Sequence, residues 1–271
     1  PLGRAVAKRP RVAHLRPIRG VRTVVGGSGV RGLMRGLVGA LLPVQCAGCR
    51  AWDEVLCPSC RHRAQAEPIP TVVDGARGDL PALAMGDYAG SLRHIILAAK
   101  HSSHTDLSDF LDEAGARLGA ALGGVLGVAG SPAAASGSLE GRASCAGGAV
   151  DVWVVPAPSS WKRRLRGRQV ALPLAHAVAR ALAAGARPGV RVRVVDAVRL
   201  RIGATSQSGK AGAQRTVGRM GSMRALAVPG PGVRVVAVDD VVTTGATIRE
   251  MERVLGGLDA VVAICRPGLI T

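Results

Sequence analysis

The fold class of this chain is decided by residues 235–247, VVAVDDVVTTGAT. Four apolar residues that favour β-structure predict a strand buried on both faces, and two carboxylates follow where that strand ends. A turn rich in hydroxyls and glycine then opens a helix that we predict over residues 246–255. A buried strand that leads directly into a helix is typical of an open α/β sheet, in which ligands lie beyond the carboxyl ends of the strands.

The turn after this strand carries the groups that bind a phosphate. A helix N-terminus offers free N–H groups and the positive end of the helix dipole to an anion. Glycine at the turn lets the backbone approach the ligand closely, and threonine hydroxyls add donors beside the backbone amides. The predicted phosphate-binding residues are Thr243, Thr244, Gly245, Ala246 and Thr247.

The two acids before the turn suit a different part of the same ligand. Asp239 and Asp240 are not expected to bind the phosphate, because like charges repel. They are better suited to accept hydrogen bonds from sugar hydroxyls or to hold the water shell of a metal. A sugar phosphate is therefore the ligand that fits the whole stretch. The alternative is an ordinary buried strand, turn and capped helix in which the acids are a solvated strand end.

Residues 235–247 resemble the thirteen-residue motif with which type I phosphoribosyltransferases bind 5-phosphoribosyl 1-pyrophosphate (PRPP). The wording Asp-Asp-Val-Val-Thr-Thr-Gly-Ala-Thr is most similar to the ComF (competence protein, GntX-like) branch. The resemblance implies an α/β fold with a parallel sheet flanked by helices. It also implies Mg²⁺-dependent pentosyl transfer from PRPP to a nitrogen nucleophile, as in nucleotide metabolism or salvage. Asp239 and Asp240 would bind the ribose hydroxyls, and one of them would assist proton movement.

Four cysteines form a second motif near the start of the chain. Their spacing is C-x2-C-x7-C-x2-C, and each pair can wrap one edge of a tetrahedral Zn²⁺. Four sulfurs leave no open coordination position, so this zinc would be structural. Disulfides and vestigial cysteines are the alternatives. ComF-like proteins commonly carry such a module just before the transferase domain. The predicted zinc ligands are Cys46, Cys49, Cys57 and Cys60.

A basic stretch follows the strand predicted over residues 151–155. It is similar to the ComF pattern Val-Pro-x-Pro followed by an arginine-rich segment, which implies a loop that binds pyrophosphate and Mg²⁺. Exposed amides and cations at the carboxyl end of a strand would neutralise the leaving group. A solvated charged turn is the alternative. The implied loop residues are Ala157, Pro158, Ser159, Lys162, Arg163 and Arg164.

The resemblance also assigns residues that cover the site. Lys100 ends a helix predicted over residues 92–99 and is a candidate for meeting the incoming nucleophile, although a lysine that complements a helix dipole is the alternative. Gln207 and Arg215 lie in a glycine-rich loop, residues 203–223, and match a lid that closes over PRPP. A closed lid excludes water from a reaction that hydrolysis would otherwise waste.

These motifs divide the chain into three parts. Residues 1–28 form a basic tail that we expect to be disordered. Residues 29–66 hold a predicted helix and the zinc module. Residues 67–271 form the phosphoribosyltransferase-like domain, with a hood at about 82–125 and a flexible insertion at 129–149. The predicted connection from Pro68 to Pro81 is a linker, and residues 190–198 are predicted as one core strand.

Charge and hydropathy limit the partners. The chain has 36 basic and 18 acidic residues, a formal net charge of +18, which favours an anionic ligand such as phosphate, pyrophosphate or nucleic acid. No apolar run reaches transmembrane length, because Arg31 and Arg35 interrupt the one candidate. The predicted helix at 30–42 suits docking on the domain, with a membrane surface as the alternative. We expect a cytoplasmic protein.

Two functions from different classes remain open. The first is PRPP-dependent transfer to an unidentified nitrogenous acceptor, with a homodimer as a candidate assembly. The second is a DNA-uptake factor that binds single-stranded DNA and uses PRPP only as a regulator, or keeps a vestigial site. The scarcity of aromatic residues opposes the second function, since single-strand binders stack bases on aromatic rings. The chain has only five: Trp52, Tyr88, Phe110, Trp153 and Trp161.

Overall fold

The computed structural model describes residues 44–102, 105–130, 149–160, 164–165, 167–201 and 221–268. All of them belong to a unit that runs from Pro43 to Thr271. The predicted tail (1–28), the predicted helix at 30–42 and nearly all of the insertion at 129–149 lie outside these residues. Among the helices that are described, none combines the length and the apolar character that a membrane span requires.

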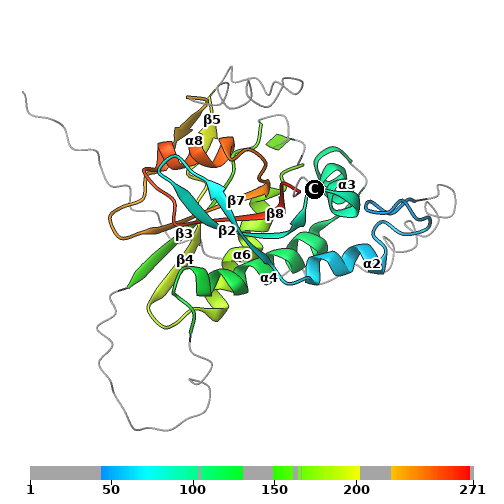
Figure 1. Cartoon of the computed structure of the whole chain (residues 1–271), viewed down its shortest axis with the longest axis horizontal. Helices are drawn as coiled ribbons and strands as arrows, with labels where there is room; N and C mark the ends of the chain where they lie inside the picture. The colour runs from blue at the N-terminus through cyan, green and yellow to red at the C-terminus, as the bar shows by residue number, and fades with distance from the viewer. Residues whose placement is uncertain are drawn as a thin grey trace, which may run out of the picture. The chain divides into compact units, whose positions relative to one another are not determined.

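A six-stranded sheet forms the centre of this unit (Figure 1). Its spatial order is β1-β2-β8-β7-β3-β4. Every neighbouring pair is parallel except β1 and β2, which are antiparallel. The predicted α/β class with a mostly parallel sheet is therefore confirmed. The strands are β1 (Ile69–Asp74), β2 (Asp79–Asp87), β3 (Val150–Pro156), β4 (Val190–Val194), β7 (Arg234–Val241) and β8 (Ala260–Arg266).

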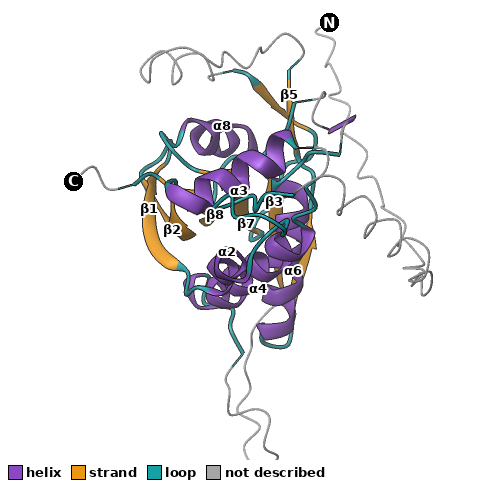
Figure 2. Ribbon diagram, turned by 90° about the vertical axis from the view of Figure 1, so that its right-hand side faces the viewer, coloured by secondary structure: helices purple, strands orange, loops and turns teal. Residues whose placement is uncertain are grey.

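Helices cover both faces of the sheet, which explains the continuous apolar run in β7. Val236 and Val238 point into the core beneath α4 (Ser108–Val125) and α6 (Ala171–Gly185). Val235 and Ala237 point into the opposite core, which α8 (Ala246–Leu255) covers. Successive residues of a strand face opposite sides, so a strand between two helical layers is apolar at every position. Figure 2 shows α8 on one side of the sheet and α4 with α6 on the other.

Glycines allow α4 and α6 to approach closely. A Cβ added to Gly119 would lie 2.4 Å from the carbonyl oxygen of Val178, and one added to Gly115 would lie 2.4 Å from the Cβ of Ala177. Both distances are shorter than atoms tolerate, so these positions of α4 accept only glycine without movement of α6. The two helices together bury the sheet face that also packs against α3 (Gly90–His101).

The predicted linker between Pro68 and Pro81 is wrong. The segment forms β1 and the first residues of β2, joined as a hairpin with Asp74 opposite Asp79. The prolines misled the prediction because proline cannot donate to a sheet. Pro70 lies in an edge strand, and Pro81 precedes the first pairing of β2 with β8 at Ala82, so neither removes a bond of the parallel ladder.

The predicted single strand at 190–198 is also wrong. The main-sheet strand β4 ends at Val194, and β5 (Val198–Leu200) pairs antiparallel with β6 (Met223–Ala225) in a separate two-stranded sheet. Asp196 lies between the two strands and accepts hydrogen bonds from Arg164 and Arg199. Two guanidinium groups thus hold this carboxylate where the chain passes from the main sheet to the small one.

Candidate functional site

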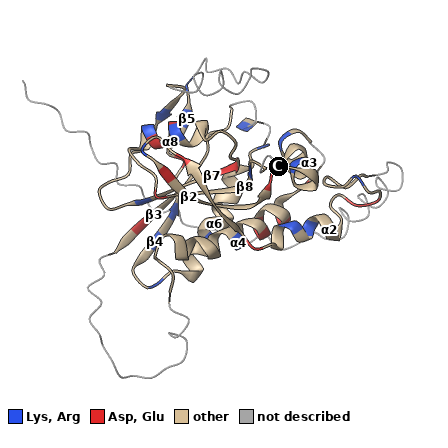
Figure 3. Ribbon diagram, viewed as in Figure 1, with Lys and Arg blue, Asp and Glu red and all other residues tan. Residues whose placement is uncertain are grey.

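The carboxyl edge of the sheet has a topological switch point between β3 and β7. The chain leaves β3 through α6 and returns as β4 on one side of β3, whereas β7 lies on the other side. Ligands of open α/β sheets bind at such a point, because the connections diverge there and leave a crevice. Charged residues gather where these strands end (Figure 3). The predicted loop 157–159 follows β3, and the predicted acids lie at the end of β7.

Both acids lie inside β7, whereas the sequence predicts them just after the end of this strand. Adjacent residues of a strand point to opposite faces, so Asp239 faces the α8 side and Asp240 faces the α3 side. Lys100 of α3 meets Asp240, with 2.7 Å between Nζ and Oδ2 and both side chains less than a fifth exposed. The structure therefore brings together two predicted site residues that are 140 positions apart in the sequence.

Asp239 is the more buried acid, with 9% of its surface exposed. Its Oδ1 accepts the backbone N–H of Asp240 at 2.8 Å. Burial, with repulsion from the carboxylate of Asp240, raises the pKa of Asp239 to about 8. At neutral pH Asp239 thus holds its proton, and Lys100 lies beside the carboxyl group of the neighbouring Asp240.

The predicted phosphate-binding turn adopts the conformation that glycine permits. Gly245 has φ +68° and precedes α8, which begins at Ala246 as predicted. A Cβ at this position would lie 2.8 Å from the carbonyl oxygen of Asp74. Arg249 braces the turn, because its Nη2 donates to the Thr244 carbonyl at 2.7 Å and its Nη1 reaches the Asp74 carboxylate at 2.7 Å. The N-terminus of α8 is thereby fixed against the β1–β2 hairpin.

A cavity of about 260 Å³ adjoins this turn. Its floor is formed by small side chains on neighbouring strands, with Ala84 of β2 in register with Ala263 of β8. Thr243, Thr244 and Arg266 supply polar groups to its lining. Asp239 and Asp240 do not line it, so the cavity lies beside the switch point and not within it.

The loop after β3 continues the sheet for one more bond before it turns away. Ala157 donates its N–H to the Val238 carbonyl at 2.7 Å, while Pro158 and Ser159 are partly exposed at the edge. Arg164 lies 3.1 Å from Asp196. Burial would raise the pKa of Asp196, but hydrogen bonds from Arg199 and Arg164 hold it below its usual range. Lys162 and Arg163 lie outside the described residues.

Four positions at or near the carboxyl edge were missed by sequence reasoning: Asp196, Arg199, Arg249 and Arg266. Arg266 ends β8, and its Nε donates to Asp87 at the end of β2 at 2.9 Å. None of these residues belongs to a motif. Asp196 lies within the strand predicted at 190–198, Arg199 directly follows it, and Arg249 lies within the helix predicted at 246–255. The predicted lid residues Gln207 and Arg215 lie outside the described residues.

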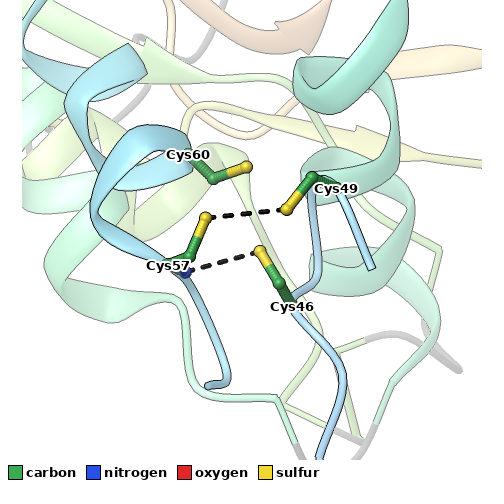
Figure 4. Close-up of side chains that lie close together, drawn as sticks. All are labelled: Cys46, Cys49, Cys57 and Cys60. Atoms are coloured by element: carbon green, nitrogen blue, oxygen red, sulfur yellow. Dashed lines mark hydrogen bonds between the residues drawn. The ribbon is translucent and has the colours of Figure 1, made fainter. Parts of the chain in front are cut away.

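The four predicted zinc ligands form a second site in the Cys module (residues 44–65). Their Sγ atoms all lie within 4.8 Å of one another, with Cys49 and Cys57 3.6 Å apart (Figure 4). A tetrahedral zinc with bonds of about 2.3 Å separates its sulfurs by roughly 3.8 Å, so the cluster fits this metal. The first pair lies on a turn closed by Arg50 N–H to the Cys46 carbonyl, and the second begins α2 (Pro58–Arg61).

Electrostatics within the cluster favour a metal. Burial would raise the pKa of Cys46, but N–H groups of Cys57, Cys49 and Gly48 lower it to about 6. Burial and the neighbouring sulfurs raise the pKa of Cys60. One thiolate thus forms readily, and its charge opposes the formation of others. A divalent cation removes that opposition, so the four cysteines could bind a structural zinc.

Comparison of the chain with protein-family models and with curated proteins found no match.

Proposed function

We propose that this chain binds PRPP with Mg²⁺ and transfers its phosphoribosyl group to a nitrogen nucleophile, as the resemblance to the ComF branch of type I phosphoribosyltransferases implies. The observation that supports it best is the order of groups along one edge of the sheet. A pair of acids ends β7, a glycine turn opens α8 directly afterwards, and a loop leaves β3 across the switch point. This order matches the three parts of a phosphorylated sugar with a diphosphate leaving group.

Each part of PRPP has its own contact in this proposal. The 5′-phosphate binds the amides and hydroxyls at the N-terminus of α8, which Arg249 holds in place. The ribose hydroxyls donate to Asp240 and the pyrophosphate binds the loop 157–164. Mg²⁺ would offset the charge of the pyrophosphate. The protein contributes mainly by positioning the two reactants and by stabilising the negative charge that develops on the leaving group.

Lys100 and Asp239 suit the two changes of charge in this reaction, which are the departure of the pyrophosphate anion and the transfer of a proton from the acceptor. When the ribose hydroxyls bind Asp240, Lys100 loses part of its present contact and becomes free to meet the pyrophosphate or the acceptor. Asp239 holds a proton at neutral pH and lies directly beside Asp240 in β7. The acceptor loses a proton as its nitrogen bonds to the sugar carbon and the bond from that carbon to the pyrophosphate breaks, and in this proposal the acid pair takes the proton up.

The Cys module is proposed to be a structural zinc knuckle. All four ligand positions are occupied by cysteine sulfur, which leaves no place for a substrate. A module of this size cannot bury a core of its own, so metal binding would supply much of its folding free energy.

Calorimetric titration with PRPP tests the proposal, with and without Mg²⁺. The parent protein should bind in the presence of Mg²⁺, and Asp240→Asn should weaken binding at least roughly tenfold, because a carboxylate that accepts two hydroxyls contributes about 1.5–3 kcal/mol. Asp151→Asn is the matched control. It removes the same charge, but at the start of β3, near the amino edge of the sheet. Equal affinities in the parent and Asp240→Asn would show that PRPP does not use this site.

A second candidate function, binding of single-stranded DNA, is favoured by one observation. Trp52 is 57% exposed on the Cys module, two residues after Arg50 in the sequence and paired with Gln45 across the turn. Exposed aromatic rings stack on bases, and contacts to phosphates depend steeply on salt. Trp52→Ala should weaken DNA binding at every salt concentration if this function holds, and PRPP binding should be unchanged.

A further inference from the structure

The Cys module is joined to the acid pair by a single helix, α3. Near its start, His94 donates from Nδ1 to the Gly48 carbonyl at 3.0 Å, and Gly48 lies between two of the clustered cysteines. Near its end, Lys100 meets Asp240 at 2.7 Å. The two contacts are six residues apart, about 9 Å along a helix.

The contact between the module and α3 is tight. A Cβ added to Gly48 would lie 2.6 Å from the Sγ of Cys60 and 3.3 Å from the Cδ1 of Ile95. The backbone at Gly48 is therefore packed between a cluster cysteine and a fully buried residue of α3. Any movement of the four sulfurs moves this backbone segment, and with it the carbonyl that His94 binds.

The face of α3 that carries Lys100 is set by the same packing. Ile96 is fully buried in the core that also contains Cys46 and Cys60, and Lys100 follows it by four residues on the same side of the helix. Lys100 is consequently directed at the end of β7 only while α3 keeps its rotation and its height above the sheet. Other contacts of α3 are made by Leu92 and Ile95 within the same core.

We propose that the Cys module acts as a metal-dependent clamp on α3 and that His94 is a positioning residue for the contact between Lys100 and Asp240. Loss of the metal releases the turn that carries Gly48. Exchange with a small-molecule disulfide does the same, because two of the thiolates are oxidised to a protein disulfide while the small disulfide is reduced to two thiols. Helix α3 then shifts, Lys100 leaves Asp240, and the acid pair loses its cation. The consequence for ligand affinity rests on the proposed PRPP function, whereas the mechanical link does not.

The reactivity of Lys100 measures this link without any ligand. The chain has only four lysines, Lys8, Lys100, Lys162 and Lys210, so mass spectrometry can follow each one during brief treatment with acetic anhydride. A paired and largely buried ammonium group reacts slowly, and the other lysines serve as internal references. Asp240→Asn removes the partner and sets the upper limit of reactivity.

We expect His94→Ala and chelator-treated protein to raise the relative reactivity of Lys100 at least roughly threefold, because both weaken a charge-assisted contact. His62→Ala is the control on the same module, since His62 bonds Gln65 and not α3. His94→Asn keeps a donor of similar reach and should restore the parent value. If His94→Ala does not fold, two other variants test the same link. The reactivity of Lys100 should be parent-like in His94→Asn and raised in Cys49→Ser.

Two results would overturn the proposal. One is a parent-like reactivity of Lys100 in both His94→Ala and metal-depleted protein while Asp240→Asn raises it. The other is an unchanged reactivity in Asp240→Asn, which would show that the contact does not form in solution. Failure of PRPP to bind would leave the labelling pattern intact, so this proposal and the proposed function can fail separately.

Discussion

The two candidate sites of this protein are assembled in opposite ways. The Cys module takes its four sulfurs from fifteen consecutive residues, between Cys46 and Cys60. The carboxyl edge takes its charged groups from the ends of β2, β7 and β8, from the second residue after β4 and from α3, between Asp87 and Arg266. The first site depends on local turns, and the second depends on which strands lie side by side.

This difference explains what each site can tolerate. A local site that is held by a metal keeps its geometry as long as the metal is bound, because four bonds fix a small segment of chain. The edge has no such tether, and its acids are kept in place by neighbouring cations and by burial. Removing one group should therefore abolish the module outright, but should shift the edge only by the free energy of individual contacts.

The largest effect is expected at the module. Cys60→Ser should reduce bound zinc from about one per chain to a small fraction and lower the melting temperature by more than about 10 °C, because structural zinc contributes on the order of 10 kcal/mol to such a module. Elemental analysis and circular dichroism measure the two quantities. Cys265→Ala, at a fully buried cysteine outside the module, is the control and should retain the metal. A full complement of zinc in Cys60→Ser would contradict the assignment.

Sequence reasoning succeeded where the information is local. The spacing of the cysteines predicted a cluster that the structure brings within 4.8 Å, and the apolar run before Asp239 predicted a strand covered on both faces. The helix predicted from about 246 to 255 agrees with α8, which glycines with positive φ flank at Gly245 and Gly256. In each case the pattern that carries the prediction lies within about fifteen consecutive residues.

Sequence reasoning failed where the information is topological. The partnership of Arg266 with Asp87 depends on β8 pairing with β2, two strands that are more than 170 residues apart. Asp196 was not predicted as a site residue, because Arg164 and Arg199, which donate to it, come from different segments of the chain. The hairpin of β1 and β2 was missed since its prolines are tolerated only by virtue of their places in the sheet. No local pattern marks any of these residues.

A smaller effect is expected at the turn that opens α8. Gly245→Ala should cost about 3 kcal/mol, from the positive φ and from the contact of its Cβ with the Asp74 carbonyl. Gly256→Ala, at the other end of the same helix, has φ +87° but meets nothing within 4 Å, so it should cost only about 1–2 kcal/mol. Urea unfolding measures both values. Equal costs would show that the turn is not pressed against the hairpin.

The last effect is expected at Asp239, and its size depends on pH. The pKa of this carboxyl is about 8 in the folded protein and about 3.9 in the unfolded chain, so the folded state binds the proton more tightly. Its contribution therefore makes the free energy of unfolding fall as the pH rises from about 4 to about 8, and level off above that range. Asp239→Asn keeps the shape and hydrogen-bonding capacity of the neutral acid but cannot ionise. Its stability relative to the parent should therefore rise between pH 5 and pH 8, by up to about 1.4 kcal/mol for each pH unit.

Urea unfolding of the parent and Asp239→Asn across this pH range gives the difference directly, with Asp151→Asn as the control for loss of a carboxylate elsewhere on the sheet. A difference that stays constant between pH 5 and pH 8 would mean that Asp239 is ionised throughout. Both acids would then carry charge at the end of β7, and Lys100 alone would have to balance them.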